Sequence, residues 1–152
     1  NKTPRATITV DAMGAQGDRH YGRSSARALL LVPMAVYDAI SAHGIKLAPG
    51  SLGENLTVSG LPTELPVGTL LELGSTLAEV SGACTVCASL SVLDPRLPKL
   101  SYRRRGMYLK VRYGGPLNVE DPVRIVSPQS AAAWTAARHA SSPGVLQSST
   151  RA

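Results

Sequence analysis

The stretch Leu77-Ala-Glu-Val-Ser-Gly-Ala-Cys-Thr-Val-Cys87 brings both cysteines of the chain together at the end of a short apolar run. Residues 77–80 are typical of a β-strand, and the Ser81-Gly82 pair is expected to end it. A thiolate just beyond a strand is held by rigid backbone yet stays open to a ligand. The stretch therefore predicts a soft-metal ligand or a nucleophile at the end of a strand.

The Cys-x-x-Cys spacing by itself fits three interpretations. It could form half of a zinc site, although only His20, His43 and His139 are available to complete it, at unrelated spacings. It could be a thioredoxin-type redox pair, which normally opens a helix in a chain that alternates strands and helices. The third interpretation is structural, with two small side chains buried in a core.

Length and composition favour one β-rich domain. The chain has 152 residues, 43% hydrophobic residues and no Phe, so the core must come from Leu, Val, Ala and Ile. Fourteen Gly and eleven Pro indicate many short elements joined by turns. No apolar run reaches the roughly 18 residues of a membrane span, and no signal peptide is evident. Two cysteines fit a reducing environment, so we expect a cytoplasmic protein.

The net charge of +6 indicates anionic partners such as nucleic acid, phosphate-bearing cofactors or acidic surfaces. Part of this charge lies in residues 127–152, which contain no acidic residue. Arg103-Arg104-Arg105 is the densest cluster, either a solvated face or a clamp on an anion. Because tyrosines at 102, 108 and 113 alternate with basic residues, a basic β-barrel that binds nucleic acid is an alternative function.

The sequence pattern predicts several short strands and two helices. The Gly114-Gly115 pair is expected to form a hairpin whose returning strand spans residues 119–126, with Pro122 at a strand start or an edge. A helix is predicted from Met34, after Pro33, and ends before Gly44; an Ala-rich helix is predicted over residues 130–139. The other predicted strands span residues 6–10, 26–32, 63–73 and 107–113, with one more leading up to Val58. The strand over residues 107–113 is expected to be half-buried, because Met107, Leu109, Val111 and Tyr113 alternate with Tyr108, Lys110 and Arg112.

Two glycine-rich loops carry polar side chains that suit a binding site. In Gly14-Ala-Gln-Gly-Asp-Arg-His-Tyr-Gly22, Arg19 and His20 can donate hydrogen bonds to phosphate, whereas Asp18 can instead bond its own backbone in a plain turn. In Pro49-Gly-Ser-Leu-Gly-Glu-Asn-Leu-Thr-Val58, Glu54 and Asn55 are expected to fix the loop through backbone N–H groups; ligand contact is the alternative.

Together these segments resemble the MOSC domain, the family named after the C-terminal part of molybdenum-cofactor sulfurases. The resemblance rests on the order and spacing of several short motifs over residues 3–126. These are Gly14-x-x-Gly17-Asp18-Arg19-His20-x-Gly22, Pro49-Gly50-x-x-Gly53-Glu54-Asn55-Leu56, Gly82 followed by Cys87, Gly106-x-Tyr108-x-x-Val111, Gly114-Gly115 and Asp121-Pro122-Val123.

The resemblance implies a mainly β fold, a compact and mostly antiparallel β-barrel with a few short helices, over residues 1–126. Residues 127–152 would then be an Ala/Ser-rich helix or tail. It also implies binding of the pterin-based molybdenum cofactor, with Cys87 as thiolate ligand to molybdenum. The expected cofactor contacts are Asp18, Arg19, His20, Glu54, Asn55, Arg103 and Arg104.

The function implied first is reduction of N-hydroxylated or similar oxygenated small molecules, with electrons from a separate reductase. The runner-up is sulfur transfer, in which Cys87 carries a persulfide. Both functions use the same thiolate, so the sequence leaves the choice open. Neither needs a membrane, and nucleic acid is the less favoured partner.

Three departures from the family pattern carry expectations of their own. The usual strand before residues 1–4 is missing, so an open edge is expected to be covered by a second copy of the chain or by its tail. Cys84 is an additional thiol beside Cys87 and a candidate resolving cysteine. Glu120 stands where a turn glycine is common, a change expected to cost little at an exposed turn.

Overall fold

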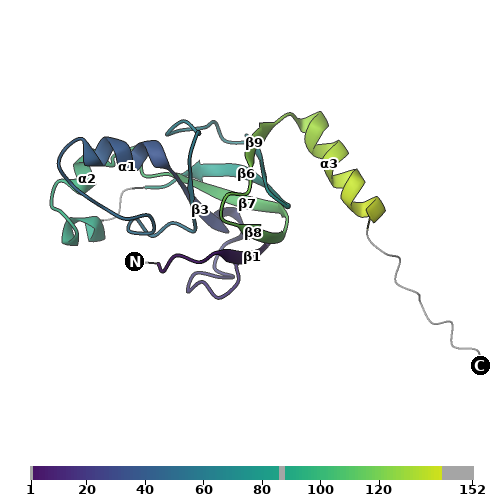
Figure 1. Ribbon diagram of the computed structural model, residues 1–152, viewed down its shortest axis with the longest axis horizontal. Helices are drawn as coiled ribbons and strands as arrows, with labels where there is room; N and C mark the ends of the chain where they lie inside the picture. Colours follow the sequence, from purple (N-terminus) through teal and green to yellow (C-terminus); the bar gives the residue numbers. More distant parts are fainter. Residues whose placement is uncertain (1, 86–87, 142–152) are drawn as a thin grey trace, which may run out of the picture.

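The computed structural model describes residues 2–85 and 88–141. Two sheets form a curled half-barrel, with helices at its two ends (Figure 1). One sheet has the order β2-β1-β8 and the other the order β4-β3-β7-β6-β5-β9. The strands are β1 (Thr7–Asp11), β2 (Gly14–Ala15), β3 (Leu29–Pro33), β4 (Leu56–Val58), β5 (Leu70–Leu73), β6 (Thr76–Ala83), β7 (Met107–Tyr113), β8 (Gly115–Asn118) and β9 (Val123–Val126).

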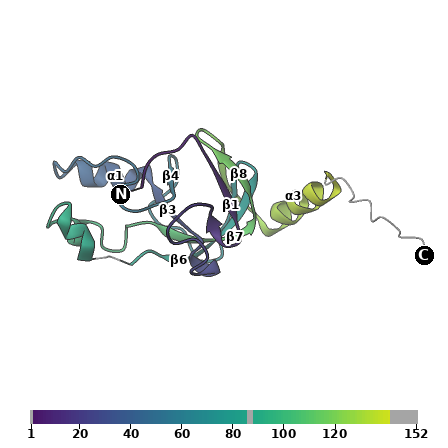
Figure 2. The ribbon, with the colours of Figure 1, turned by 90° about the horizontal axis from the view of Figure 1, so that it is seen from below.

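The helices occupy opposite ends of the molecule. Helix α1 (Met34–Ser41) and the short α2 (Leu97–Leu100) lie at one end, whereas α3 (Pro128–Ser141) extends from the other (Figures 1 and 2). Two 3-10 helices, η1 (Ser25–Arg27) and η2 (Ala88–Val92), complete the secondary structure. None of the helices in the described ranges has the length and hydropathy of a bilayer-spanning segment.

Strand β3 separates two hydrophobic cores because both of its faces are buried. Leu29 and Leu31 pack into the interior of the half-barrel, and Leu30 and Val32 face the core beneath α1. Successive side chains of a strand point to opposite faces, so one apolar run serves both cores. The core under α1 also contains Cys84, and it is this core that positions the thiol end of β6.

Strand β6 corrects the expectation that Ser81-Gly82 ends the strand. The strand continues to Ala83, and its pairing with β7 shifts register between Val80 and Gly82. An extra residue in one strand forms a β-bulge, which bends the strand without ending it. The thiols therefore follow a longer strand than the sequence predicted.

The predicted hairpin at Gly114-Gly115 is wrong, because the chain does not turn back onto β7. Strand β8 pairs with β1, and β9 pairs with β5. A Cβ atom at Gly114 would overlap the carbonyl oxygen of Val10, so glycine here allows a close backbone approach. Pro122 does precede an edge strand, as predicted, since β9 is the last strand of its sheet.

Other elements differ from the predictions mainly in their limits. The strand predicted over residues 26–32 begins as the 3-10 helix η1 and becomes extended only at Leu29. The one predicted over residues 63–73 is regular only in β5. Strand β4 pairs in parallel with β3, the one parallel pair among the described strands of an otherwise antiparallel fold. The mainly β prediction with a few short helices is confirmed.

Candidate functional site

The thiol end of β6 is built by its pairing with β7. Ala83 pairs with Met107, and the backbone N–H of Cys84 donates to the carbonyl oxygen of Gly106 at 2.9 Å. This pairing turns the Cys84 side chain into the core under α1, where the residue is only 3% exposed. Its Sγ atom lies 3.4 Å from the hydroxyl oxygen of Tyr108 and 3.6 Å from the carbonyl oxygen of Thr85.

Tyr108 joins this thiol to a cation. The guanidinium carbon of Arg27 lies 5.1 Å from the centre of the Tyr108 ring, which is cation–π distance. Burial raises the pKa of Tyr108, and the hydrogen bond with Cys84 raises it further, although Arg27 and Arg105 oppose the rise. The hydroxyl, which is protonated at neutral pH in an ordinary tyrosine, thus remains protonated here and keeps a proton beside the thiol.

Arg105 is the second cation at this end of the molecule. Its Nη1 donates to the carbonyl oxygen of Thr85 at 3.2 Å and its Nη2 to that of Leu52 at 2.9 Å. Its Nε is buried and has no partner among the described residues. Arg105 thus links the segment after β6 to the glycine-rich loop and keeps one unused donor. We call Cys84, Tyr108, Arg27 and Arg105 the thiol–arginine cluster.

Cys87, the predicted molybdenum ligand, lies outside the described residues. The structure places what flanks it in the sequence: Thr85, whose carbonyl Arg105 binds, and Ala88, where η2 begins. Within residues 2–85 and 88–141, no group of three or more His, Cys, Asp or Glu side chains could hold a metal ion.

Asp18 organises the first glycine-rich loop. Its carboxylate accepts hydrogen bonds from Lys2 Nζ, from Asn55 Nδ2 and, at 2.8 Å, from the backbone N–H of His20. Burial raises the pKa of Asp18, but these hydrogen bonds outweigh it and lower the pKa to about 2. The last bond is the Asx turn that the sequence offered as the alternative to ligand binding.

Glu54 and Asn55 fix the second loop, as the sequence favoured. Glu54 is 3% exposed, and its Oε1 accepts hydrogen bonds from the Tyr37 hydroxyl, from the Gly50 N–H at 2.8 Å and from Thr57 Oγ1 at 2.9 Å. Burial raises the pKa of Tyr37, and the bond to Glu54 adds to this. Asn55 Oδ1 accepts from the backbone N–H of Leu30 at 2.9 Å and so ties the loop to β3.

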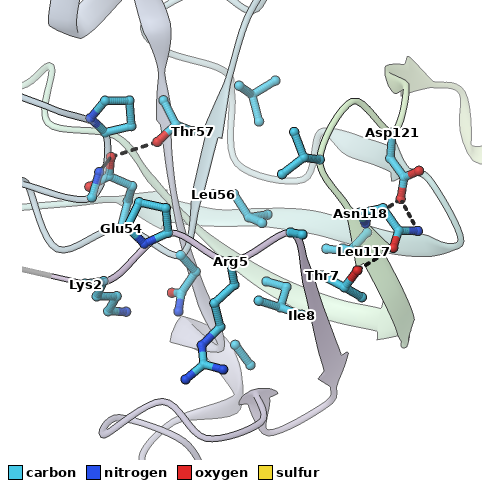
Figure 3. Close-up of a pocket in the computed structure, with 18 of the residues that line it drawn as sticks. Lys2, Arg5, Thr7, Ile8, Glu54, Leu56, Thr57, Leu117, Asn118 and Asp121 are labelled. Atoms are coloured by element: carbon cyan, nitrogen blue, oxygen red, sulfur yellow. Dashed lines mark hydrogen bonds between the residues drawn. The ribbon is translucent and has the colours of Figure 1, made fainter.

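Four predicted cofactor contacts share an open cleft of about 1100 Å³ between β1, β4 and the β8–β9 connection. Glu54 and Thr57 lie toward one end in Figure 3, Asn118 and Asp121 toward the other, and Arg5 between them. The predicted residues that line it are Asp18, Arg19, Glu54 and Asn55. No residue of α3 lines the cleft, so the described part of the C-terminal segment does not cover it.

The remaining predicted contacts are not brought together. His20 is exposed and adjoins the cleft only through its neighbours, while Arg103 and Arg104 are exposed and stand apart from it. In the arginine run it is Arg105, which the sequence did not single out, that enters the thiol–arginine cluster. Arg27 and the thiol contact of Tyr108 were also missed. The alternation of side chains along β7 places Tyr108 on the face of the strand opposite to that of the core-facing Leu109. Only the tertiary structure shows that Tyr108 contacts Cys84.

The tyrosines do not form a stacking surface for nucleic acid bases. Tyr108 belongs to the thiol–arginine cluster, and Tyr113 packs edge-on against Trp134 of α3 with ring centroids 5.3 Å apart. Tyr102 alone of the three is well exposed, at 66%. Base stacking on successive aromatic residues therefore has no platform on β7.

The fold and these motifs define a MOSC protein. Residues 16–124 match the MOSC domain family, and the chain belongs to it. No curated protein sequence matches this chain.

Solved structures share the fold. YiiM from Geobacillus stearothermophilus has a TM-score of 0.68 at 24% identity, over 82% of this chain and 63% of its own. YiiM from Escherichia coli has a TM-score of 0.65 at 24% identity, over 80% and 62%. The YuaD protein from Bacillus subtilis has a TM-score of 0.70 at 21% identity, over 78% and 84%. The chain thus spans less than two thirds of the YiiM chains.

Proposed function

We propose that this chain is a molybdenum-cofactor-binding oxidoreductase domain that reduces N-hydroxylated or similar oxygenated small molecules. The observation that carries the proposal is the thiol–arginine cluster. In it Arg105 binds the carbonyl oxygen of Thr85, the residue after Cys84, and Arg27 lies on the ring of Tyr108, which contacts Cys84. Membership of the MOSC family supports the same assignment. Cys87 is the proposed metal ligand.

The donor set fits the cofactor's chemistry. A molybdenum–dithiolene group is soft and accepts a thiolate ligand, and its pterin carries a phosphate. Arg105 offers a buried Nε–H without a partner among the described residues, and Arg27 adds a second positive charge. Guanidinium groups bind phosphate with strong, charge-assisted hydrogen bonds. The residues that would hold the cofactor are therefore Cys87, Arg105 and Arg27, with Arg19 as an exposed candidate from the cleft.

When bound, the cofactor supplies two-electron chemistry with removal of an oxygen atom from the substrate. The chain's own residues bind, orient and hold protons around it. Tyr108 keeps its hydroxyl proton at neutral pH, since burial and Cys84 raise its pKa further above the ordinary tyrosine value, so it can donate a hydrogen bond to a polar group at the site. Arg105 connects the loop at Leu52 to the segment at Thr85, because it donates hydrogen bonds to the carbonyl oxygens of both residues.

Sulfur transfer is the second candidate, favoured by the buried thiol of Cys84 three residues before Cys87. In this function Cys87 would carry a persulfide, and a nucleophilic acceptor would attack its outer sulfur and release Cys87 as a thiolate. In the absence of an acceptor, Cys84 would be available to attack the inner sulfur, which releases hydrosulfide and forms a Cys84–Cys87 disulfide. The thiolate required is the same, but no molybdenum is needed.

Metal and sulfur analysis separates the two functions. The protein is produced in a host that makes molybdenum cofactor, and molybdenum, pterin and cyanide-releasable sulfur are measured on the same sample. Near-stoichiometric molybdenum and pterin are expected. Releasable sulfur without molybdenum would contradict the oxidoreductase and favour sulfur transfer.

A further inference from the structure

Residues 88–105 form a helical projection that starts directly after the cysteine segment and ends at Arg105. Helices η2 and α2 pack against each other within it, and the buried side chains of Leu90 and Leu97 anchor it in the core under α1. It lies beside α1, at the end of the molecule opposite α3 (Figure 1). The projection is therefore the surface feature next to the thiol–arginine cluster.

Three large apolar side chains of the projection face solvent. Val92 is 86% exposed, Tyr102 is 66% exposed and Leu93 is 41% exposed. The segment packs through Leu90 and Leu97, which are buried, and through Leu100, which is partly buried, and not through these three side chains. Exposed apolar groups that cluster with charged ones are typical of an interaction surface.

The projection is also strongly basic. It contains five basic residues and one acidic residue, a net charge of +4. Asp94 is already neutralised by Arg96, which also donates to the carbonyl oxygen of His43 at 3.2 Å. The exposed Lys99, Arg103 and Arg104 have no ion-pair partner in the described part of the chain.

The turn that carries these charges is held in one conformation. Ser101 is fully buried and its Oγ donates to the carbonyl oxygen of Leu97 at 2.7 Å, while the N–H of Arg104 donates to the carbonyl oxygen of Ser101. Arg103 has a φ of 59°, one of two described non-glycine residues in the left-handed region. Such a conformation costs about 1 kcal/mol or more and is found preferentially at functional surfaces.

We propose that this projection is the docking surface for an acidic electron-transfer protein that reduces the site. The inference rests on the proposed function, because an oxidoreductase of this kind needs a donor. Arg and Tyr are among the residues that most often dominate binding, and the projection exposes both, together with apolar side chains and basic side chains that have no ion-pair partner in the described residues. Electron-transfer encounters use small interfaces, which a projection of this size can supply. Arginine forks also pair well with surface carboxylates.

The reaction that such a donor supports consumes two electrons. An N-hydroxylated substrate R–NH–OH takes up two electrons and two protons and gives R–NH₂ and water, with cleavage of the N–O bond. A reduced flavin protein supplies both electrons and returns to its oxidised form. Docking at residues 88–105 places that donor beside the segment that contains the cysteines.

The test measures binding of an acidic flavodoxin to the holoprotein in low and high salt. Lys99→Glu and Tyr102→Ala change the projection, and Arg124→Glu and Ile125→Ala are matched controls on β9, where both residues are exposed. Each projection variant should weaken binding by about tenfold, with unchanged binding in the controls. Added salt should weaken the parent complex as well.

A small-molecule reductant distinguishes docking from catalysis. Reduced methyl viologen reaches the site without docking, so reduction of phenylhydroxylamine by viologen should be equal in all four variants and the parent. No viologen activity, together with projection-dependent flavodoxin binding, would contradict the proposed function and support the docking surface.

Four outcomes would overturn the docking proposal. They are failure of the flavodoxin to bind, equal losses in the Arg124→Glu control, binding to anionic phosphatidylglycerol vesicles in place of the flavodoxin, and loss of viologen activity in Lys99→Glu.

Discussion

The Sγ atom of Cys84 lies 3.4 Å from the hydroxyl oxygen of Tyr108, and this contact joins the end of β6 to a half-buried side chain of β7. Cys84, the cysteine that departs from the family pattern, is itself buried in the core under α1, against which Tyr108 packs. The guanidinium of Arg27 also packs over the Tyr108 ring, so Tyr108 contacts both the Cys84 thiol and a cation.

Replacing Tyr108 by Phe should destabilise the protein moderately and leave the Arg27 contact in place. The variant loses the hydroxyl that bonds Cys84, a neutral hydrogen bond worth about 0.5–1.5 kcal/mol, and keeps an aromatic ring. Urea unfolding of the apoprotein measures the difference. Tyr113→Phe is the matched control, because the Tyr113 contacts with Trp134 and His139 are made by its ring. Equal stability of Tyr108→Phe and the parent would contradict the prediction.

Acid should remove the stabilisation that comes from Asp18. The folded-state pKa is lowered from 3.8 to about 2, so the unfolded chain binds the proton more readily than the folded one. The stabilisation is therefore complete above the unfolded value, near pH 5 and higher, and is lost as pH falls toward 2. Asp18→Asn should be less stable than the parent at pH 7, and the difference should shrink at pH 2.5–3. A difference that stays constant with pH would show that the carboxylate charge is not the cause.

Gly106→Ala should be strongly destabilising, by about 2 kcal/mol or more. Gly106 has a φ of 124°, and a Cβ atom there would overlap the carbonyl oxygen of Leu31 on the neighbouring strand. Gly82→Ala is the control, since a Cβ atom at Gly82 meets nothing within 4 Å. Thermal unfolding of both variants checks the prediction, and similar melting temperatures would contradict it.

Local sequence signals predicted the elements whose limits are set locally. The helix after Pro33 and the alternation of Met107, Leu109 and Val111 depend on neighbours in sequence, and both are found as predicted. Glu120 was identified as occupying a glycine position, and its φ of 72° is the left-handed conformation that glycine favours. These features need no knowledge of the rest of the chain.

The features that the sequence did not predict depend on strand pairing and side-chain contacts between residues far apart in the chain. A Gly-Gly pair fits a hairpin as well as a close strand crossing, and only the contact of Gly114 with Val10 distinguishes them. Tyr108, the side-chain partner of Cys84, lies 24 positions further along the chain, and Arg27 reaches the Tyr108 ring from η1, so no local pattern links these residues. For the same reason the sequence alone does not indicate that Arg105, and not Arg103 or Arg104, points inward.

Arg105→Ala should lower cofactor occupancy more than Arg104→Ala. Arg105 loses two hydrogen bonds to backbone carbonyls and the buried Nε donor, whereas Arg104 is exposed. A charge-assisted bond to phosphate is worth about 1.5–3 kcal/mol, so occupancy at limiting cofactor should fall at least about tenfold. Pterin content of the purified variants measures it, and circular dichroism checks the fold. Equal occupancy in the two variants would remove Arg105 from the site.

The two cysteines should differ in their importance for molybdenum. The resemblance to the family motifs in the sequence involves Cys87 and not Cys84, and Cys84 is buried with its thiol hydrogen-bonded to Tyr108. The thiolate is the metal ligand, and a free cysteine at pH 7 is mostly protonated until nearby cations lower its pKa from about 8.5. Cys87→Ser should therefore abolish metal binding and activity. Cys84→Ser should keep the metal and resist oxidative inactivation, because a disulfide between the two positions can no longer form. Molybdenum content and activity before and after peroxide treatment measure both effects. A zinc site or a dithiol-exchange site would need both thiols, so equal inactivity of the two serine variants would favour the redox pair over the molybdenum ligand.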